Sequence, residues 1–104
     1  MSRVGTFKEL IVYQKAYKLA MEIFEISRSF PKEETYSLTD QMRRSSRSVT
    51  SCIAESWAKR KYEKAFVSKL SDAPGEEYET EDRLDYSLDC KYITQDIHEG
   101  LMSG

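Results

Sequence analysis

Glycine and proline are scarce in this chain, which holds four glycines and two prolines in 104 residues. Turn-rich β architectures use more of both, so this scarcity argues against a β sandwich or barrel and favours long helices. Aromatic residues make up 12% of the chain, which argues against disorder even though charged residues reach 33%. A chain of this length suits one domain with a modest hydrophobic core, and we expect residues 1–104 to form it.

Residues that carry enzymatic or metal chemistry are also few. His98 is the only histidine, so the two Glu-x-x-His pairs of a ferritin-like di-iron site cannot form within one chain. Cys52 and Cys90 lie in no CxxC pair, so we interpret them as reduced, mostly buried thiols. The sequence has no GxxxxGK[ST], GxGxxG or GxSxG motif and no EF-hand loop. We expect no enzymatic activity, cofactor, metal or small-molecule substrate.

Long apolar runs are missing as well. No stretch approaches the ~18 to 20 apolar residues that span a membrane, so no membrane partner is expected. The first ten residues, MSRVGTFKEL, lack the apolar core of a signal peptide. Together with the unpaired cysteines, this predicts a cytoplasmic protein.

The apolar residues that are present recur at spacings of three and four, the period of an amphipathic helix. Such a pattern predicts a helix over residues 8–29, which ends at Phe30-Pro31 because the residue before a proline is pushed out of the helical region. A second helix is expected over 38–60, with Ser37 as its N-cap.

Two further helices complete the expected fold. A third should cover 62–90, with a kink or a break at Pro74-Gly75, which suit a helix interior poorly. A short fourth helix over 95–103 can be capped by Thr94. The four segments predict an all-α, antiparallel up-down four-helix bundle with a short fourth helix.

The second helix carries both a core stripe and the best functional candidates. At about 100° per residue, one sector holds an apolar stripe interleaved with serines, which suit close helix packing. Its members are Leu38, Met42, Ser45, Ser46, Val49, Ile53, Ser56 and Trp57. Arg43, Arg44 and Arg47 fall on the opposite side, where they form a compact cluster.

This basic cluster is a candidate contact for nucleic acid. Guanidinium groups match phosphate geometry, and a further basic group lies three to four turns along the chain. That group is Lys59, Arg60, Lys61 and Lys64. Together the two groups can track a phosphate backbone without reading bases. For a run of charges taken alone, a solvated helix surface is the simpler explanation.

The charges divide unevenly along the chain, although the net charge is only -2. Residues 1–61 carry 12 basic and 7 acidic side chains, and residues 62–104 carry 4 and 11. The candidate acidic face of the third helix comprises Asp72, Glu76, Glu79, Asp82, Asp85 and Asp89. If this face meets the basic face of a neighbouring chain, the contact is head-to-tail and closes into a ring where the rotation permits.

The segment FKELIVYQKAYKLAMEIFEISRSFPKEETYSLTDQMRRSSRSVTSCIAES resembles the N-terminal half of a bacterial four-helix-bundle family. Its members are encoded in intervening sequences of 23S ribosomal RNA genes, and a ribosomal-protein description common among them rests on gene location. The pieces KAFVSKLSDA and LDCKYI match a subgroup, and the resemblance covers about residues 7–100. In this family a proline usually stands where Thr50 is, helix formers replace Pro74-Gly75-Glu76, and the fourth helix runs further than Gly104.

The resemblance implies a four-helix bundle that assembles into a homopentameric ring. It also implies similarity to the accessory protein of diversity-generating retroelements, a basic barrel that binds nucleic acid and a reverse transcriptase. No enzymatic activity is attached to the family. The departures imply a straighter second helix, a less regular third helix, and core surface left uncovered beside the short fourth helix.

Three interpretations follow. The first is a non-enzymatic, self-assembling bundle protein whose basic surface contacts RNA or DNA. The second is a protein-interaction scaffold in which basic and acidic faces pair between subunits, without nucleic acid. The third, a hydrolase without a recognisable motif, has the least support. The net charge of -2 counts against strong nucleic-acid binding.

Overall fold

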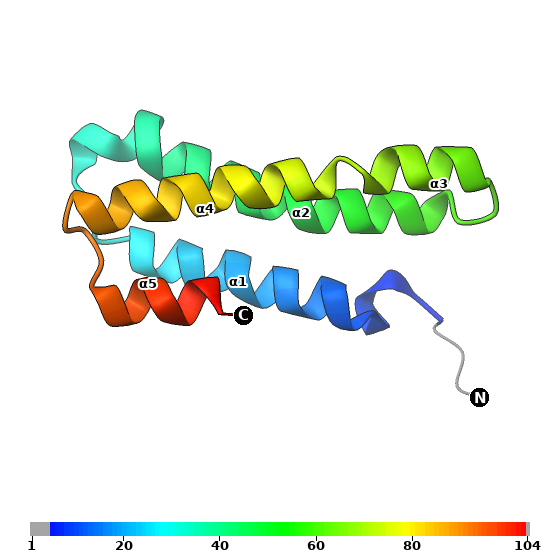
Figure 1. Cartoon of the computed structure of the whole chain (residues 1–104), viewed down its shortest axis with the longest axis horizontal. Helices are drawn as coiled ribbons and strands as arrows, with labels where there is room; N and C mark the ends of the chain where they lie inside the picture. The colour runs from blue at the N-terminus through cyan, green and yellow to red at the C-terminus, as the bar shows by residue number, and fades with distance from the viewer. Residues whose placement is uncertain (1–4, 104) are drawn as a thin grey trace.

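A computed structural model describes residues 5–103, and residues 1–4 and 104 of the expected domain lie outside this part of the chain. The described part is all-helical and contains no strand. Its α-helices are α1 (Ile11–Ser27), α2 (Asp40–Ala58), α3 (Glu63–Leu70), α4 (Ala73–Asp89) and α5 (Gln95–Met102), as Figure 1 shows. None of them is long and apolar enough to cross a membrane.

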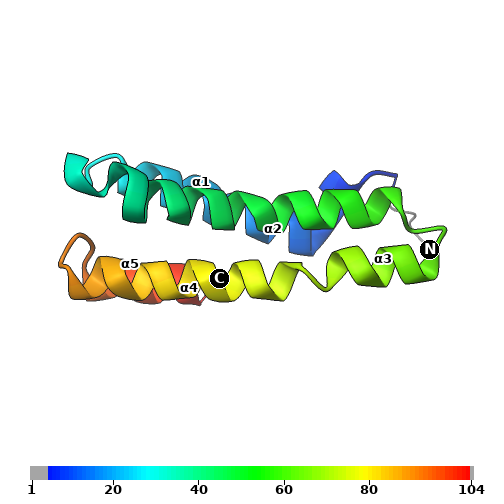
Figure 2. The same ribbon diagram turned by 90° about the horizontal axis from the view of Figure 1, so that it is seen from above.

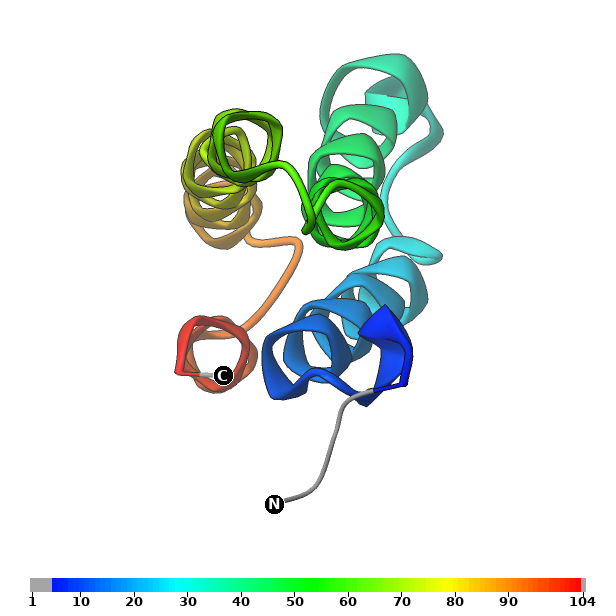
Figure 3. The ribbon, with the colours of Figure 1, turned by 90° about the vertical axis from the view of Figure 1, so that its right-hand side faces the viewer.

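The helices lie in two layers. Figure 2 shows α1 and α2 in one layer and α3, α4 and α5 in the other. Seen end-on in Figure 3, α1, α2, the α3–α4 rod and α5 surround one common axis. Helix α2 packs against α1 on one side and against α3 and α4 on the other, so it is the central element of the fold. Successive rods run in opposite directions (Figure 1), which is compatible with the expected up-down bundle.

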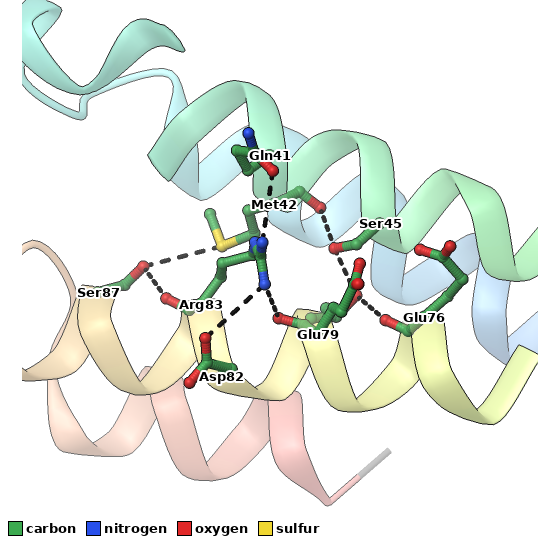
Figure 4. Close-up of polar contacts among 9 residues, drawn as sticks. Gln41, Met42, Ser45, Glu76, Glu79, Asp82, Arg83 and Ser87 are labelled. Atoms are coloured by element: carbon green, nitrogen blue, oxygen red, sulfur yellow. Dashed lines mark hydrogen bonds and ion pairs between the residues drawn. The ribbon is translucent and has the colours of Figure 1, made fainter. Parts of the chain in front are cut away.

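The core forms where these helices face one another. Ile23 of α1, Met42 of α2 and Leu84 of α4 are almost completely buried. Four more buried side chains join them, namely Phe30, Leu38, Ile93 and Leu101. Small hydroxyl residues let α2 approach α4 closely, since Ser45 Oγ and Thr80 Oγ1 lie 2.8 Å apart in the buried interface (their neighbourhood is drawn in Figure 4).

The starts of the first two helices differ from the sequence-based expectation. Phe7–Glu9 forms a separate 3-10 turn, and Leu10 is extended, so α1 begins at Ile11. The expected N-cap at Ser37 is wrong. Thr35–Thr39 forms one π-helical turn before α2, and the Ser37 hydroxyl donates instead to Glu34 Oε1 at 2.6 Å.

The expected third helix is two helices. The chain breaks at Ser71 and Asp72, so that Pro74 falls in the first turn of α4, where its missing N–H costs no helical hydrogen bond. A Cβ added at Gly75 would meet no side chain within 4 Å, so no close contact requires glycine there. At the start of α5, the Thr94 hydroxyl accepts a hydrogen bond from the Ile97 N–H at 3.2 Å, which is the predicted cap.

The end of α4 is closed by a left-handed residue, Lys91, with φ 66°. The Lys91 N–H donates to the Leu88 carbonyl at 2.9 Å and the Tyr92 N–H to the Ser87 carbonyl at 2.9 Å, which is the Schellman arrangement. Cys90 is exposed at this turn, so the expectation of a buried thiol is wrong there, whereas Cys52 is buried.

Candidate nucleic-acid interface

The seam between α1 and α2 gathers aromatic rings and arginines. On α1, Tyr17, Phe24 and Ser27 lie on one side of the helix at spacings of seven and three, and Phe24 and Ser27 contact Arg43 of α2. The facing side of α2 presents Arg43 and Arg47 at one end of the seam, where the cations lie over one ring of α1.

Arg43 is held in place from two sides. Its Nε donates to Ser27 Oγ at 2.9 Å, and its guanidinium carbon lies 4.8 Å from the centre of the Phe24 ring. Ser27 is buried and donates in turn to the Phe24 carbonyl at 3.1 Å. The expectation that Arg43 points away from the bundle is therefore wrong: its side chain is half-buried against α1.

Two further guanidinium groups approach the same ring. Arg47 lies 5.9 Å and Arg28 5.8 Å from the Phe24 ring centre. We call Arg28, Arg43 and Arg47, with Phe24, the Phe24 cluster. Sequence analysis did not single out Arg28, although its i, i+4 spacing from Phe24 was a signal. Arg28 also pairs with Glu25 at 3.6 Å.

The three predicted arginines have no carboxylate partner in the part of the chain that the structure describes. Among residues 5–103, no ion pair within 4.0 Å involves Arg43, Arg44 or Arg47. Arg44 is exposed and does not lie over the Phe24 ring. The structure thus brings Arg43 and Arg47 together with Arg28 and leaves Arg44 beside them on the solvent side.

The second basic group is separate from the first. Lys59, Arg60, Lys61 and Lys64 are all exposed where α2 gives way to α3. Arg60 stacks 4.4 Å from the Trp57 ring centre and donates from Nη1 to the Trp57 carbonyl at 2.9 Å. Arg47 and Lys59 are twelve residues apart, about 18 Å at the helical rise of 1.5 Å per residue.

The predicted acidic residues do not form one face. Asp72, Glu76 and Glu79 line a groove of about 510 Å³ along the edge where α2 meets α3 and α4. In that groove Lys69 pairs with Glu55 at 3.0 Å and with Asp72 at 3.8 Å. This edge is therefore negative except for Lys69, whose pKa is raised mainly by its hydrogen bond to Glu55.

Burial and the neighbouring Glu79 raise the pKa of Glu76 in the same groove. Burial also raises the pKa of the Cys52 thiol, which keeps this cysteine protonated and weakly nucleophilic.

The remaining acids have local partners or none. Asp82 lies 3.7 Å from Arg83 Nη1, and Figure 4 shows that Arg83 also reaches the Glu79 carbonyl and the Gln41 side chain. Asp85 Oδ1 lies 2.8 Å from His98 Nε2 and so ties α4 to α5. Asp89 is exposed, and within residues 5–103 it has no cation within 4.0 Å.

The two edges of α2 consequently differ in sign. The α1 edge carries the Phe24 cluster. The other edge carries the groove lined by Asp72, Glu76 and Glu79, in which Lys69 lies and which we call the Lys69 groove. Within residues 5–103, no three His, Cys, Asp or Glu side chains are arranged to hold a metal ion. On the α1 edge an anion would meet the guanidinium groups of Arg43 and Arg47, which have no carboxylate within 4.0 Å among residues 5–103.

Comparison with known proteins gives one family. A search among curated proteins found no match for this chain. The family model described as 23S rRNA-intervening sequence protein matches residues 8–104, which is nearly the whole chain. The chain belongs to the 23S rRNA-intervening sequence protein family.

Proposed function

We propose that this protein is a non-enzymatic, self-assembling four-helix-bundle protein of the cytoplasm that contacts RNA or DNA through its basic surface. The observation that carries the proposal is the Phe24 cluster, in which three guanidinium groups lie within 6 Å of one ring centre. Like charges repel, so such a gathering costs free energy unless an anion occupies it. Only Arg28 of the three has a carboxylate partner among residues 5–103.

The geometry suits a phosphate. Arg43 uses its Nε on Ser27 and rests on the ring, which leaves the Nη edge of the guanidinium available. A guanidinium fork held in one orientation binds a phosphate at a lower entropic cost than a mobile lysine does. The group at Lys59, Arg60, Lys61 and Lys64 supplies further phosphate contacts about 18 Å along α2.

The dependence of binding on salt concentration tests this proposal. Labelled RNA and DNA oligonucleotides are titrated with protein at several salt concentrations, and the association constant is measured by fluorescence anisotropy. Because each lost phosphate contact reduces counterion release, Arg43→Ala and Arg47→Ala should each flatten the plot of log K against log salt by ~0.7 for a single strand.

Lys91→Gly is the matched control. It also removes one positive charge, but from the α4–α5 turn, so its slope should equal that of the wild type. Absence of binding at low salt would sink the proposal, and so would equal slopes for all four proteins.

Self-assembly is proposed on separate observations. Helix α5 accompanies only part of α1 (Figure 1), and the space beside its last residues is a pocket of about 270 Å³ lined by Leu19, Val49, Leu84 and Leu101, among others. Ile11 and Val12 at the start of α1 are 69% and 60% exposed. Apolar surface of this kind favours contact with another chain.

A pentameric ring is the stoichiometry we propose. Static light scattering at micromolar concentration should then give a mass of about 60 kDa, for five chains of 12.1 kDa each. A mass of one chain would reject self-assembly, and another multiple would reject the pentamer alone.

The second candidate function is a scaffold in which charged faces pair between subunits. It is favoured by the solvent-facing side of α4, where Tyr78 and Tyr86 are 70% and 58% exposed beside Asp82 and Asp89. If Arg44 meets this face in a neighbour, Arg44→Glu should dissociate the oligomer and Asp89→Lys should restore it. An unchanged mass for Arg44→Glu would rule out this pairing.

A further inference from the structure

A row of aromatic side chains follows the α1 side of the seam. The Phe7 and Tyr13 ring centroids are 4.9 Å apart and nearly perpendicular, and the Tyr13 and Tyr17 centroids are 6.0 Å apart. Phe24 lies two turns beyond Tyr17, about 10.5 Å along the helix. Tyr17 is 53% exposed, so much of its side chain meets solvent rather than core. Core packing alone does not explain this row.

Cations accompany the row along its length. A surface pocket of about 510 Å³ is lined by Lys8, Tyr13, Gln14, Tyr17 and Lys18. At its Phe24 end the row runs into the guanidinium groups of Arg28, Arg43 and Arg47. Among these five cations, only Lys18 and Arg28 have a carboxylate within 4.0 Å in the described chain, at 3.8 Å and 3.6 Å. The row therefore lies in a positive strip.

We propose that this strip binds single-stranded nucleic acid, with an unpaired base stacked on Tyr17 and the strand's phosphates on the Phe24 cluster. The inference rests on the proposed function and narrows its ligand to a strand with unpaired bases. Base stacking on aromatic side chains combined with a basic track is the general means of binding single strands. In a duplex the base faces are already stacked on one another, so no base is free to stack on an exposed aromatic ring. A duplex would therefore be bound through its phosphates alone.

The base-stacking ring and the phosphate-binding arginines lie along one path on the surface. Tyr17 and Phe24 lie on the same side of α1, so one strand running along the seam meets the exposed ring and then the arginines. The groove along the opposite edge of α2 is lined by Glu55, Asp72, Glu76 and Glu79, which would repel a phosphate backbone and confine it to the α1 side.

The test compares one labelled oligonucleotide of about twelve nucleotides, within the usual site size of a single-strand binder, with the same strand annealed to its complement. RNA and DNA versions are both measured by anisotropy at low salt. The wild type should bind the single strand more tightly than the duplex. Tyr17→Leu should weaken single-strand binding about fivefold or more and leave duplex binding and the salt slope unchanged, because no charge is removed.

Two variants sharpen this expectation. Tyr17→Phe keeps the ring and should bind as the wild type does. Tyr78→Leu removes a tyrosine that is 70% exposed on α4, away from the seam, and should also bind as the wild type does. Urea unfolding of each variant checks that the fold is kept, which we expect because Tyr17 is largely outside the core.

The possible failures are distinguishable. If single strand and duplex bind equally and Tyr17→Leu has no effect, the stacking inference is wrong while the phosphate contacts of the proposed function stand. If no oligonucleotide binds at low salt, both are wrong. If Tyr78→Leu weakens binding as much as Tyr17→Leu does, the site lies on α4 and the strip is not the single-strand site.

Discussion

Replacing Phe24 with leucine should loosen the arginines without changing the charge of the protein. The ring has guanidinium groups at 4.8, 5.8 and 5.9 Å from its centre. A cation–π contact at an exposed site contributes ~0.5 to 1 kcal/mol, and two of the three distances are close to the ~6 Å limit. We therefore expect Phe24→Leu to lower the free energy of unfolding by about 1 to 2 kcal/mol, most of it from Arg43.

Urea unfolding followed by circular dichroism measures this change. For a slope of ~2 kcal/mol per molar urea, the midpoint should fall by about 0.5 to 1 M. Phe66→Leu is the matched control, because Phe66 is also half-buried and no arginine of residues 5–103 lies over its ring. The same Phe24→Leu protein should bind nucleic acid more weakly with an unchanged salt slope. If its midpoint and its affinity both equal those of the wild type, the ring does not hold the arginines and the reasoning is refuted.

Three further predictions concern the fold. Lys91→Gly should raise the free energy of unfolding by about 0.5 to 1 kcal/mol, since Lys91 has φ 66° and glycine adopts this conformation without strain; a lower urea midpoint would contradict the Schellman turn. Leu84→Ala should lower the free energy of unfolding, measured with urea, by about 2 to 4 kcal/mol. The loss should stay below the largest values for buried Leu→Ala substitutions, because Leu84 borders the pocket beside α5 and the surrounding side chains can collapse into the space. A loss under ~1 kcal/mol would place Leu84 outside the core. The hydrogen bond to Glu34 raises the pKa of Tyr92 to about 12, so its contribution to stability is present below pH 10.0 and is lost as the pH rises through about 12. An absorbance titration should therefore lose its step near pH 12 in Tyr92→Phe, and a step that persists would show that another tyrosine produces it.

The core stripe of α2 could be predicted because burial follows the helical period. Met42, Val49 and Ile53 are buried as their spacing indicates. The serines of the stripe are buried too, and Ser45 and Ser56 donate to carbonyls three residues earlier in their own helix. Their hydroxyl groups thus need no partner from another helix, which is why polar residues can occupy a close-packed seam.

The helix boundaries were less predictable, because several local signals compete. Ser37 has the chemistry of an N-cap, but the π-helical turn over Thr35–Thr39 places it before the helix and its hydroxyl finds Glu34. Pro74 marked an irregularity correctly, but a proline is equally compatible with a kink and with the first turn of a new helix. Only the packing of the whole chain against α2 decides between these.

The candidate site was predicted in its residue types and not in its geometry. A helical wheel places Arg43 away from the core centre, but it cannot say that α1 lies along that side. The contact of Arg43 with Ser27 joins residues sixteen positions apart, and no local pattern encodes it. For the same reason the helical period of the third helix predicts a single acidic face. In the structure Asp72, Glu76 and Glu79 line the Lys69 groove beside α2, whereas Asp85 contacts His98 of α5.

The most direct test of the central claim observes the arginines themselves. In nitrogen–proton NMR spectra, the Nε–H signals of Arg28, Arg43 and Arg47 are followed while a single-stranded oligonucleotide is added at low salt. The account predicts that these signals shift in a saturable manner, while that of Arg83, which is engaged with Gln41 and the Glu79 carbonyl, stays in place. Shifts confined to the group at 59–64, or an absence of shifts in all arginines, would contradict it.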